Sequence, residues 1–101
     1  KTGAWSTAGE TIPTERAGSF SVAWKGRVLV LGGESGEQQE AHAEVEAFDP
    51  KTGEWESLAA MRQGRHGTGV AVAKGKLWVA AGSANRGGGP ELTTLESWVG
   101  R

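Results

Sequence analysis

The apolar residues of this chain fall into short runs separated by polar, glycine-containing stretches, which is typical of strands rather than helices. Two runs of small apolar residues, 18–24 and 67–73, have the composition of a strand that is buried on both faces. Each is followed by a Lys-Gly pair, typical of a tight hairpin turn, and then by a second β-rich run, 27–31 or 76–80. The pattern therefore predicts two antiparallel hairpins.

A third strand is predicted in each half of the chain. Residues 43–48 and 93–99 alternate apolar with polar side chains, as a strand with one covered face does. In the first half, the turn at 49–53, with the sequence Asp-Pro-Lys-Thr-Gly, leads into a short fourth strand at 54–57 that carries Trp55. We label the strands of each unit a, b, c and d in chain order.

The chain is internally repeated. The sequence Lys-Thr-Gly-x-Trp occupies residues 1–5 and again 51–55, and the block at 45–48 matches that at 95–98, both at an offset of 50. Between these blocks, Arg16, Gly18, Val22, Lys25, Gly26, Val30 and Gly33 match Arg65, Gly67, Ala71, Lys74, Gly75, Val79 and Gly82 at an offset of 49. Three blocks in the same order indicate two copies of one structural unit.

The repeat also distinguishes between two predictions for residues 54–63, a helix and a strand followed by a loop. Taken alone, this segment suits a helix with one apolar face. Its counterpart, 3–13, contains Gly3, Gly9 and Pro13, which a helix does not accommodate. Because equivalent segments of a repeat share a structure, we predict a strand followed by a loop in both.

Composition fits many short strands joined by glycine turns and pinned by a few large side chains. Of the 101 residues 17 are glycine, and five of the seven aromatic residues are tryptophan. A formal charge of −1 gives no overall field that would attract nucleic acid or an anionic membrane, so neither partner is predicted. The chain has no cysteine, so it offers no disulfide framework, thiolate metal site or thiol nucleophile, and its compartment stays undetermined.

No signal or membrane-spanning segment is recognisable in the sequence. The longest apolar runs fall far short of the roughly 20 residues that a membrane span needs, and the N-terminus lacks a basic start followed by an apolar core. The sequence is therefore interpreted as a soluble chain. It begins at Lys1 rather than at methionine, which we take as a sign of trimming or excision.

Several features of the sequence, in the order in which they occur along the chain, resemble the kelch repeat. They are the Gly32-Gly33 pair that ends strand b, the Val-Glu-x-aromatic strand c, the Asp-Pro-x-Thr-Gly-x-Trp turn and the arginine that follows. The resemblance covers essentially the whole chain twice. The second unit departs from it at Ala81, which replaces the first glycine before Gly82, at 99–101, which replaces Asp-Pro, and at Trp98, where tyrosine is common.

The resemblance implies an all-β fold of two four-stranded antiparallel kelch-type blades, arranged radially with strand a innermost. Across the single unit 1–101 the strand order is d-abcd-abc: an outer strand at 1–7, a full blade at 18–57, and a blade at 67–99 that lacks its outer strand. Trp5, Trp55 and Trp98, with Gly32, Gly33 and Gly82, are expected to have structural roles between blades.

Two blades alone would expose apolar faces and unpaired edges, so we expect further copies of the chain to complete the propeller. The outer strand of one copy would finish the last blade of the next, a head-to-tail contact that closes into a ring. Three chains give six blades and four give eight; the homotrimer is favoured over the homotetramer. The rival interpretation is that the two blades were cut from a longer chain, and an engineered piece of a propeller is a third.

Any ligand is expected on the face that carries the long b-c and d-a loops, because loops on a rigid scaffold commonly carry function. The candidates at this face and at the channel mouth are Arg16, Arg65, His66, Glu34 and Arg86. The partner considered for the loop-bearing face is a protein or a small anionic ligand. A ring of arginines could bind a carboxylate or a phosphate by paired hydrogen bonds. Their repetition in each blade favours a structural role instead.

Three other residue groups were weighed for chemistry. The loop that carries Glu34, Glu37, Glu40, His42 and Glu44 has groups that a divalent ion uses but no recognised ligand spacing, so no metal site is predicted. The glycines at 87–89 match no phosphate-loop pattern. No spacing suggests a nucleophile with an oriented base, so no catalytic residue and no cofactor is predicted.

From these observations we interpret the chain as a non-catalytic scaffold or protein-interaction module that self-assembles into a closed ring. The alternative is a piece of a bacterial kelch enzyme or binding protein that acts on acidic sugars through arginines at the channel mouth. Copper oxidases with a kelch-like ring need tyrosine and cysteine ligands, and this chain has neither residue, so that class is excluded.

Overall fold

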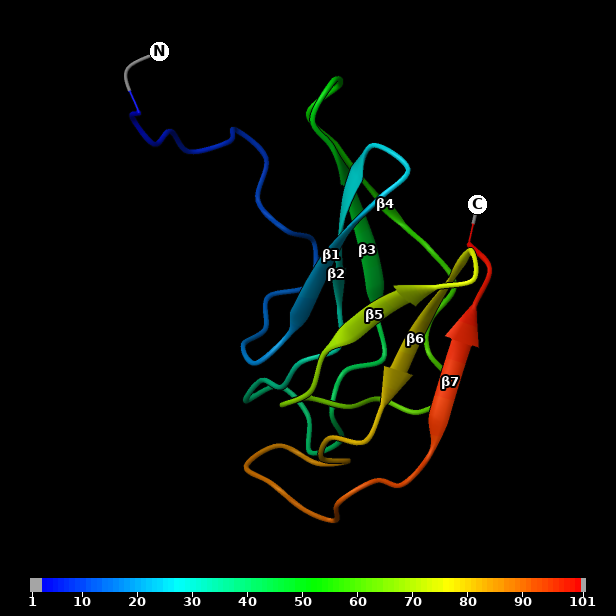
Figure 1. Ribbon diagram of the computed structural model, residues 1–101. Helices are drawn as coiled ribbons and strands as arrows, with labels where there is room; N and C mark the ends of the chain where they lie inside the picture. The colour runs from blue at the N-terminus through cyan, green and yellow to red at the C-terminus, as the bar shows by residue number, and fades with distance from the viewer. Residues whose placement is uncertain (1–2, 101) are drawn as a thin grey trace.

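Two antiparallel sheets make up the computed structural model, which describes residues 3–100 (Figure 1). The first has the order β1-β2-β3-β4 and the second β5-β6-β7. The strands are β1 (Phe20–Trp24), β2 (Arg27–Leu31), β3 (Val45–Asp49), β4 (Glu54–Ser57), β5 (Val70–Ala73), β6 (Lys76–Ala80) and β7 (Leu95–Trp98). The predicted all-β architecture of a four-stranded and a three-stranded meander is therefore confirmed.

The Lys-Gly hairpin turns have the conformation that the sequence predicts. Lys25 and Gly26 have φ values of 51° and 80°, and Lys74 and Gly75 have 51° and 72°. Positive φ at both central residues defines a turn whose twist matches that of the flanking strands. The turns fix the register at Trp24↔Arg27 in the first sheet and Ala73↔Lys76 in the second, and the rest of each hairpin follows.

The inner strands differ from the prediction in length and in burial. They begin at Phe20 and Val70 rather than at 18 and 67, because Gly18 and Gly67 have φ values of 62° and 74° and cannot continue a strand. The expected burial on both faces is wrong for the single chain. In β1, alternate residues are exposed, and in β5 the last three residues are exposed, because no other described element covers those faces.

The hydrophobic core lies where the two sheets face each other. Leu29 from β2 and Leu77 from β6 are 0% and 1% exposed. The buried hydrophobic residues of this cluster are Phe20, Trp24, Leu29, Leu31, Val45, Ala47, Leu77 and Val79. The sheets also touch through β1 and β5, so the a strands are adjacent, as expected for neighbouring propeller blades.

Glycine is required where the backbone of one unit crosses that of the other. A side chain on Gly64 would overlap the backbone carbonyl of Ala41, and one on Gly32, whose φ is 66°, would overlap that of Arg65. The adjacent Gly33 N–H donates to the Arg65 carbonyl at 2.9 Å. The predicted Gly32-Gly33 pair therefore lies at the junction between the two sheets.

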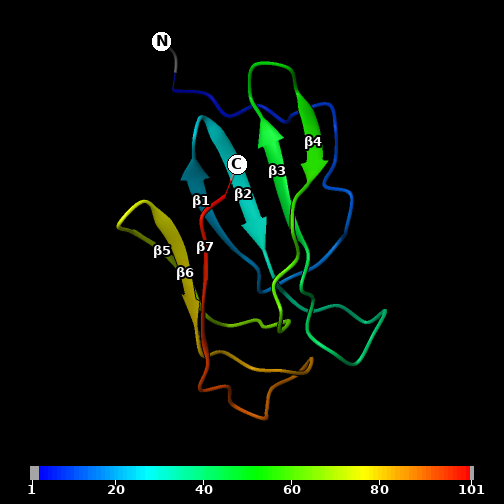
Figure 2. The same ribbon diagram turned by 90° about the vertical axis from the view of Figure 1, so that its right-hand side faces the viewer.

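Figures 1 and 2 show that tight turns and long loops gather at opposite ends of the sheets, as the strand order predicts. The part of the predicted outer strand at 3–7 has no strand structure, and residues 1–2 lie outside the described residues. Trp5 is 99% exposed, so within one chain it packs between no blades. Over residues 3–100 there is no helix of the length and apolarity that a membrane crossing requires.

Candidate functional site

The long loops of the two blades are joined by hydrogen bonds into one surface. The Ala41 N–H donates to the Ala84 carbonyl at 2.8 Å, and the Arg86 N–H donates to the Gln39 carbonyl at 2.8 Å. The Arg86 guanidinium reaches the Gly36 carbonyl at 3.1 Å. This surface, formed by the β2-β3 and β6-β7 loops, is called the loop face below.

Arg16 is built into the first blade. Its side chain is 0% exposed and donates to the carbonyls of Gly32, Thr14 and Val30 at 2.5, 2.7 and 3.0 Å. It also pairs with the Glu46 carboxylate at 2.8 Å. The guanidinium therefore joins the incoming loop to β2 and β3.

Arg65 has the same place in the second blade. Its side chain is also 0% exposed, donates to the carbonyls of Ala81 and Thr94 at 2.8 and 3.2 Å, and pairs with Glu96 at 2.8 Å. The two predicted arginines thus direct their hydrogen-bond donors into their own blades. The ligand-binding role predicted for them stays a prediction, while these contacts support the structural interpretation.

The glutamates of strand c hold the loop that leads into each blade. Glu46 accepts from the N–H and the hydroxyl of Thr14 at 3.3 and 2.6 Å. Glu96 accepts from the N–H groups of Arg62 and Gln63 at 2.8 and 2.9 Å. Burial raises the pKa of Glu96, but these N–H groups and the Arg65 guanidinium lower it by more, so the net pKa lies below the ordinary value.

The other three predicted ligand-binding residues meet at the junction between the blades. His66 Nε2 lies 2.8 Å from the Asn85 carbonyl and 3.5 Å from a Glu34 carboxylate oxygen. The same carboxylate oxygen accepts the Gly87 N–H at 2.7 Å, beside Arg86. Glu34, His66 and Arg86 are therefore brought together on the loop face. Arg16 and Arg65, by contrast, lie inside the blades.

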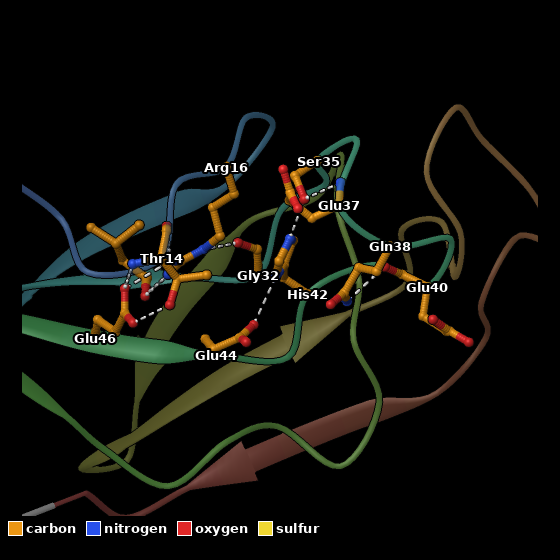
Figure 3. A network of polar contacts seen from close by, with 11 residues as sticks. Thr14, Arg16, Gly32, Ser35, Glu37, Gln38, Glu40, His42, Glu44 and Glu46 are labelled. Atoms are coloured by element: carbon orange, nitrogen blue, oxygen red, sulfur yellow. Dashed lines mark hydrogen bonds and ion pairs between the residues drawn. The ribbon is translucent and has the colours of Figure 1, made fainter.

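A second polar cluster, which the sequence did not indicate, lies at the β2-β3 loop (Figure 3). The Ser35 hydroxyl lies 2.8 Å from His42 Nε2, and His42 Nδ1 lies 2.9 Å from a Glu44 carboxylate oxygen. In the sequence, His42 and Glu44 suggest no role other than that of metal ligands. Within residues 3–100 no group of three metal-ligating side chains comes together. The only sequence signal was a serine ahead of a His-x-Glu pair in one loop.

A hollow of about 410 Å³ lies between the two sheets beside β7, where it is also lined by Leu31 and Val45 of the first sheet and by Leu77 and Val79 of β6. Its walls include Ala59, Ala60, Met61 and Arg62 from the loop after β4, and Trp98 from β7. In the first sheet the corresponding edge is covered by β4, where Trp55 lies opposite Phe48 with their ring centroids 5.2 Å apart. The two sheets thus differ in that no described strand pairs with the outer edge of β7.

Comparison with known proteins places these features in a family. The model of the Kelch motif matches residues 15–62. Kelch-like protein 40 of Xenopus laevis is 36% identical over 78 residues, which are 77% of this chain and 12% of that protein. Kelch-like protein 13 of Mus musculus is 39% identical over 59 residues, which are 58% of this chain and 9% of that protein.

Among solved structures, that of YjhT superposes on 68% of this chain with a TM-score of 0.59 and 27% sequence identity. The chain covers 21% of the YjhT chain. It therefore corresponds to a small part of each of these proteins.

Proposed function

This chain belongs to the kelch-repeat family and consists of kelch-type β-propeller blades, and from that premise we propose that it is a binding scaffold that closes into a ring with copies of itself. The scaffold would present the loop face to a protein partner. The observation that carries the ring is the hollow beside β7, because part of its lining is equivalent in the repeat to residues that surround Trp55 in the first blade.

The first blade shows how such a site is filled. Trp55 of β4 lies opposite Phe48 of β3, and it lines a hollow together with Glu10, Thr11 and Pro13 from the incoming segment. A tryptophan on the outer strand therefore covers both the third strand and the segment that leads into the blade.

The second blade has equivalent residues in the segment that leads into it. At an offset of 49, Glu10, Thr11 and Pro13 correspond to Ala59, Ala60 and Arg62, and all three of the latter line the hollow beside β7. Trp98 stands where Phe48 stands in the first blade. These equivalences support the assignment of the hollow as the place where the second blade would receive a tryptophan.

Trp5 has the properties of the missing side chain. It ends the Lys-Thr-Gly-x-Trp sequence that recurs with Trp55, and it is 99% exposed. We infer that the segment around Trp5 of one copy pairs with β7 of the next copy and places the indole in the hollow. Each such contact adds two blades, so three copies make six blades, within the range of four to eight known for propellers.

The experiment is the solution mass of the 101-residue chain by light scattering after size exclusion. The proposal predicts three times the chain mass of 10.5 kDa, and four times would mean an eight-bladed ring. A folded monomer at high concentration would refute self-assembly and leave the binding scaffold only.

Acidic-sugar binding through channel-mouth arginines is the weaker candidate. It needs guanidinium groups that face a ligand, whereas the donors of Arg16 and Arg65 bind carbonyls and carboxylates inside the blades. A partner on the loop face would meet Glu34, Arg86 and their neighbours instead.

A further inference from the structure

Ser35, His42 and Glu44 have the connectivity of a serine hydrolase triad (Figure 3). One nitrogen of the His42 imidazole is 2.8 Å from the Ser35 hydroxyl, and the other is 2.9 Å from the Glu44 carboxylate. A histidine that bridges a hydroxyl and a carboxylate in this way can take the proton of the hydroxyl while the carboxylate orients the ring.

The network also selects the tautomer that this chemistry needs. A carboxylate only accepts hydrogen bonds, so His42 Nδ1 must carry the proton that it shares with Glu44. Nε2 is then free to accept the Ser35 proton. Burial raises the pKa of Glu44, but its own backbone N–H and the His42 ring lower it by more, so Glu44 is ionised at neutral pH.

The kelch blade does not require these three residues, as the second blade demonstrates. The N–H groups of His42 and Leu92 donate to the carbonyls of Gly33 and Gly82, both at 2.8 Å, so these positions are equivalent. By the same comparison Glu44 corresponds to Thr94, since their carbonyls accept from Gly32 and Ala81 at 3.0 and 3.1 Å. Ser35 corresponds to Ala84 at the offset of 49.

The second blade thus forms the same backbone contacts with Ala84, Leu92 and Thr94, none of which can do this chemistry. Arg16 and Glu46, by contrast, recur as Arg65 and Glu96, which is expected of residues that hold a blade together. The Ser-His-Glu set is therefore an addition to the first blade rather than a part of the repeat.

The hydroxyl is accessible while the histidine is not. Ser35 is partly exposed and lines a hollow of about 380 Å³ with Ala17 and Gly36, whereas the His42 side chain is 5% exposed. Arg16 also lines the hollow, but its side chain is 0% exposed and its charge is paired with Glu46, whereas three glutamates add acidic side chains to the lining: Glu15, Glu34 and Glu37. They would repel an anionic substrate and favour a neutral or cationic one.

We propose that Ser35, His42 and Glu44 form a nucleophilic site that hydrolyses small neutral or cationic carboxylic esters. Ser35 Oγ attacks the acyl carbon as its proton passes to His42 Nε2. The ester C–O bond then breaks, and the leaving alcohol takes that proton. Water attacks the acyl-serine, His42 takes a proton from the water and returns it to Ser35 Oγ, and the carboxylic acid departs.

The residue after the nucleophile in the sequence is Gly36, and in hydrolases with a nucleophile elbow the backbone N–H at that sequence position donates to the developing oxyanion. All three triad residues come from one loop of one blade, so the activity goes beyond the scaffold role and does not depend on ring closure.

The first test is covalent labelling of the folded chain with a fluorophosphonate probe, followed by peptide mass spectrometry. We expect the label on Ser35, with none in S35A and undiminished labelling in S21A, a control serine on β1. Labelling spread over several serines, or absent altogether, would overturn the proposal.

The second test is the hydrolysis of p-nitrophenyl acetate by the native chain and by the triple variant S35A/H42L/E44T. This variant carries the residues of the second blade at all three positions, so it should keep the fold, which circular dichroism and thermal unfolding would verify. We expect its rate to fall to that of buffer. An unchanged rate in the folded triple variant would refute the role of the triad.

A third experiment tests the predicted substrate class by comparing the hydrolysis of a cationic and an anionic ester. Lysine p-nitrophenyl ester should be hydrolysed about thirtyfold faster than mono-p-nitrophenyl succinate at low salt, relative to their rates in buffer. One charge pair at about 4 Å in water is worth about 1 kcal/mol, and the cationic ester is attracted where the anionic ester is repelled, so the two differ by about 2 kcal/mol. Equal acceleration of both esters would contradict the assignment of the acidic hollow to substrate binding.

Discussion

Replacement of Trp5 by alanine should dissociate the proposed ring into monomers without unfolding the blades. Trp5 is 99% exposed in the single chain, so its removal costs the isolated chain almost no packing. In the ring it would lie in the hollow lined by Ala59, Ala60 and Trp98. A tryptophan buries about 150–250 Å², which corresponds to about 4–6 kcal/mol at about 25 cal/mol per Å².

Truncation to alanine is expected to cost about 3–5 kcal/mol at each interface. The association constant of each contact then falls by a factor of about 10² to 10⁴. Light scattering over a dilution series should show the native chain at three times 10.5 kDa and W5A at the monomer mass in the micromolar range. W5F keeps an aromatic ring and should retain most of the assembly.

A second variant tests the other side of the same contact. In A60W a tryptophan of the chain itself would occupy the hollow and exclude Trp5 of the next copy. If W5A and A60W both remain trimeric with the dilution behaviour of the native chain, the assignment of Trp5 to the hollow is wrong.

Three further predictions concern the blades themselves. R65A should lower the free energy of unfolding by about 3–5 kcal/mol, because it removes the fully buried guanidinium that pairs with Glu96 and donates to the Ala81 and Thr94 carbonyls. Urea titration measures this, and a loss below about 1 kcal/mol would contradict the structural role. Glu96 has a lowered pKa in the folded chain, so its contribution is complete above its unfolded value near 4.5 and is lost as the pH falls through the lower folded value. Thermal unfolding of E96Q should therefore depend less on pH below about 4.5 than that of the native chain, and equal dependence would refute the linkage. G64A should destabilise the fold by roughly 1–3 kcal/mol because its methyl group would overlap the Ala41 carbonyl. An unchanged melting temperature would contradict the close approach of the backbones at Gly64 and Ala41.

The sequence predicted the elements that depend on local chemistry. The Lys-Gly turns, the a-b-c-d and a-b-c order within the two sheets and the strand at 54–57 follow from turn preferences and from the repeat, and all are confirmed, whereas the outer strand predicted at 1–7 is not formed over residues 3–7. The start of the inner strands was missed by two or three residues, because the positive φ values of Gly18 and Gly67 depend on how the incoming loop crosses the blade.

The candidate site was less predictable than the fold, because it depends on the direction in which each long side chain points and on the group that it contacts. The equivalence of Arg16 and Arg65 is visible in the repeat, but only the structure reveals that both point into their blades. Ser35 and His42 are seven positions apart in a loop without periodicity, so the only sequence signal of their contact is a serine ahead of a His-x-Glu pair. Comparison of the blades could have drawn attention to them, since Ala84 and Leu92 replace them in the second unit.

Ring closure through the Trp5 segment can be tested most directly by a designed disulfide. In the first blade Glu56 pairs with Ala47, and these positions correspond to Ser6 and Ser97. The chain has no cysteine, so S6C/S97C introduces only this pair. Opposed strand positions have the spacing that a disulfide needs.

On mild oxidation, S6C/S97C should form covalent dimers and trimers on a non-reducing gel, and the series should end at the trimer because the ring closes there. S6C and S97C mixed as single variants should give only heterodimers of the two chains. Absence of crosslinks in the double variant, or a ladder that continues well beyond four chains, would contradict a closed ring completed by the Trp5 segment.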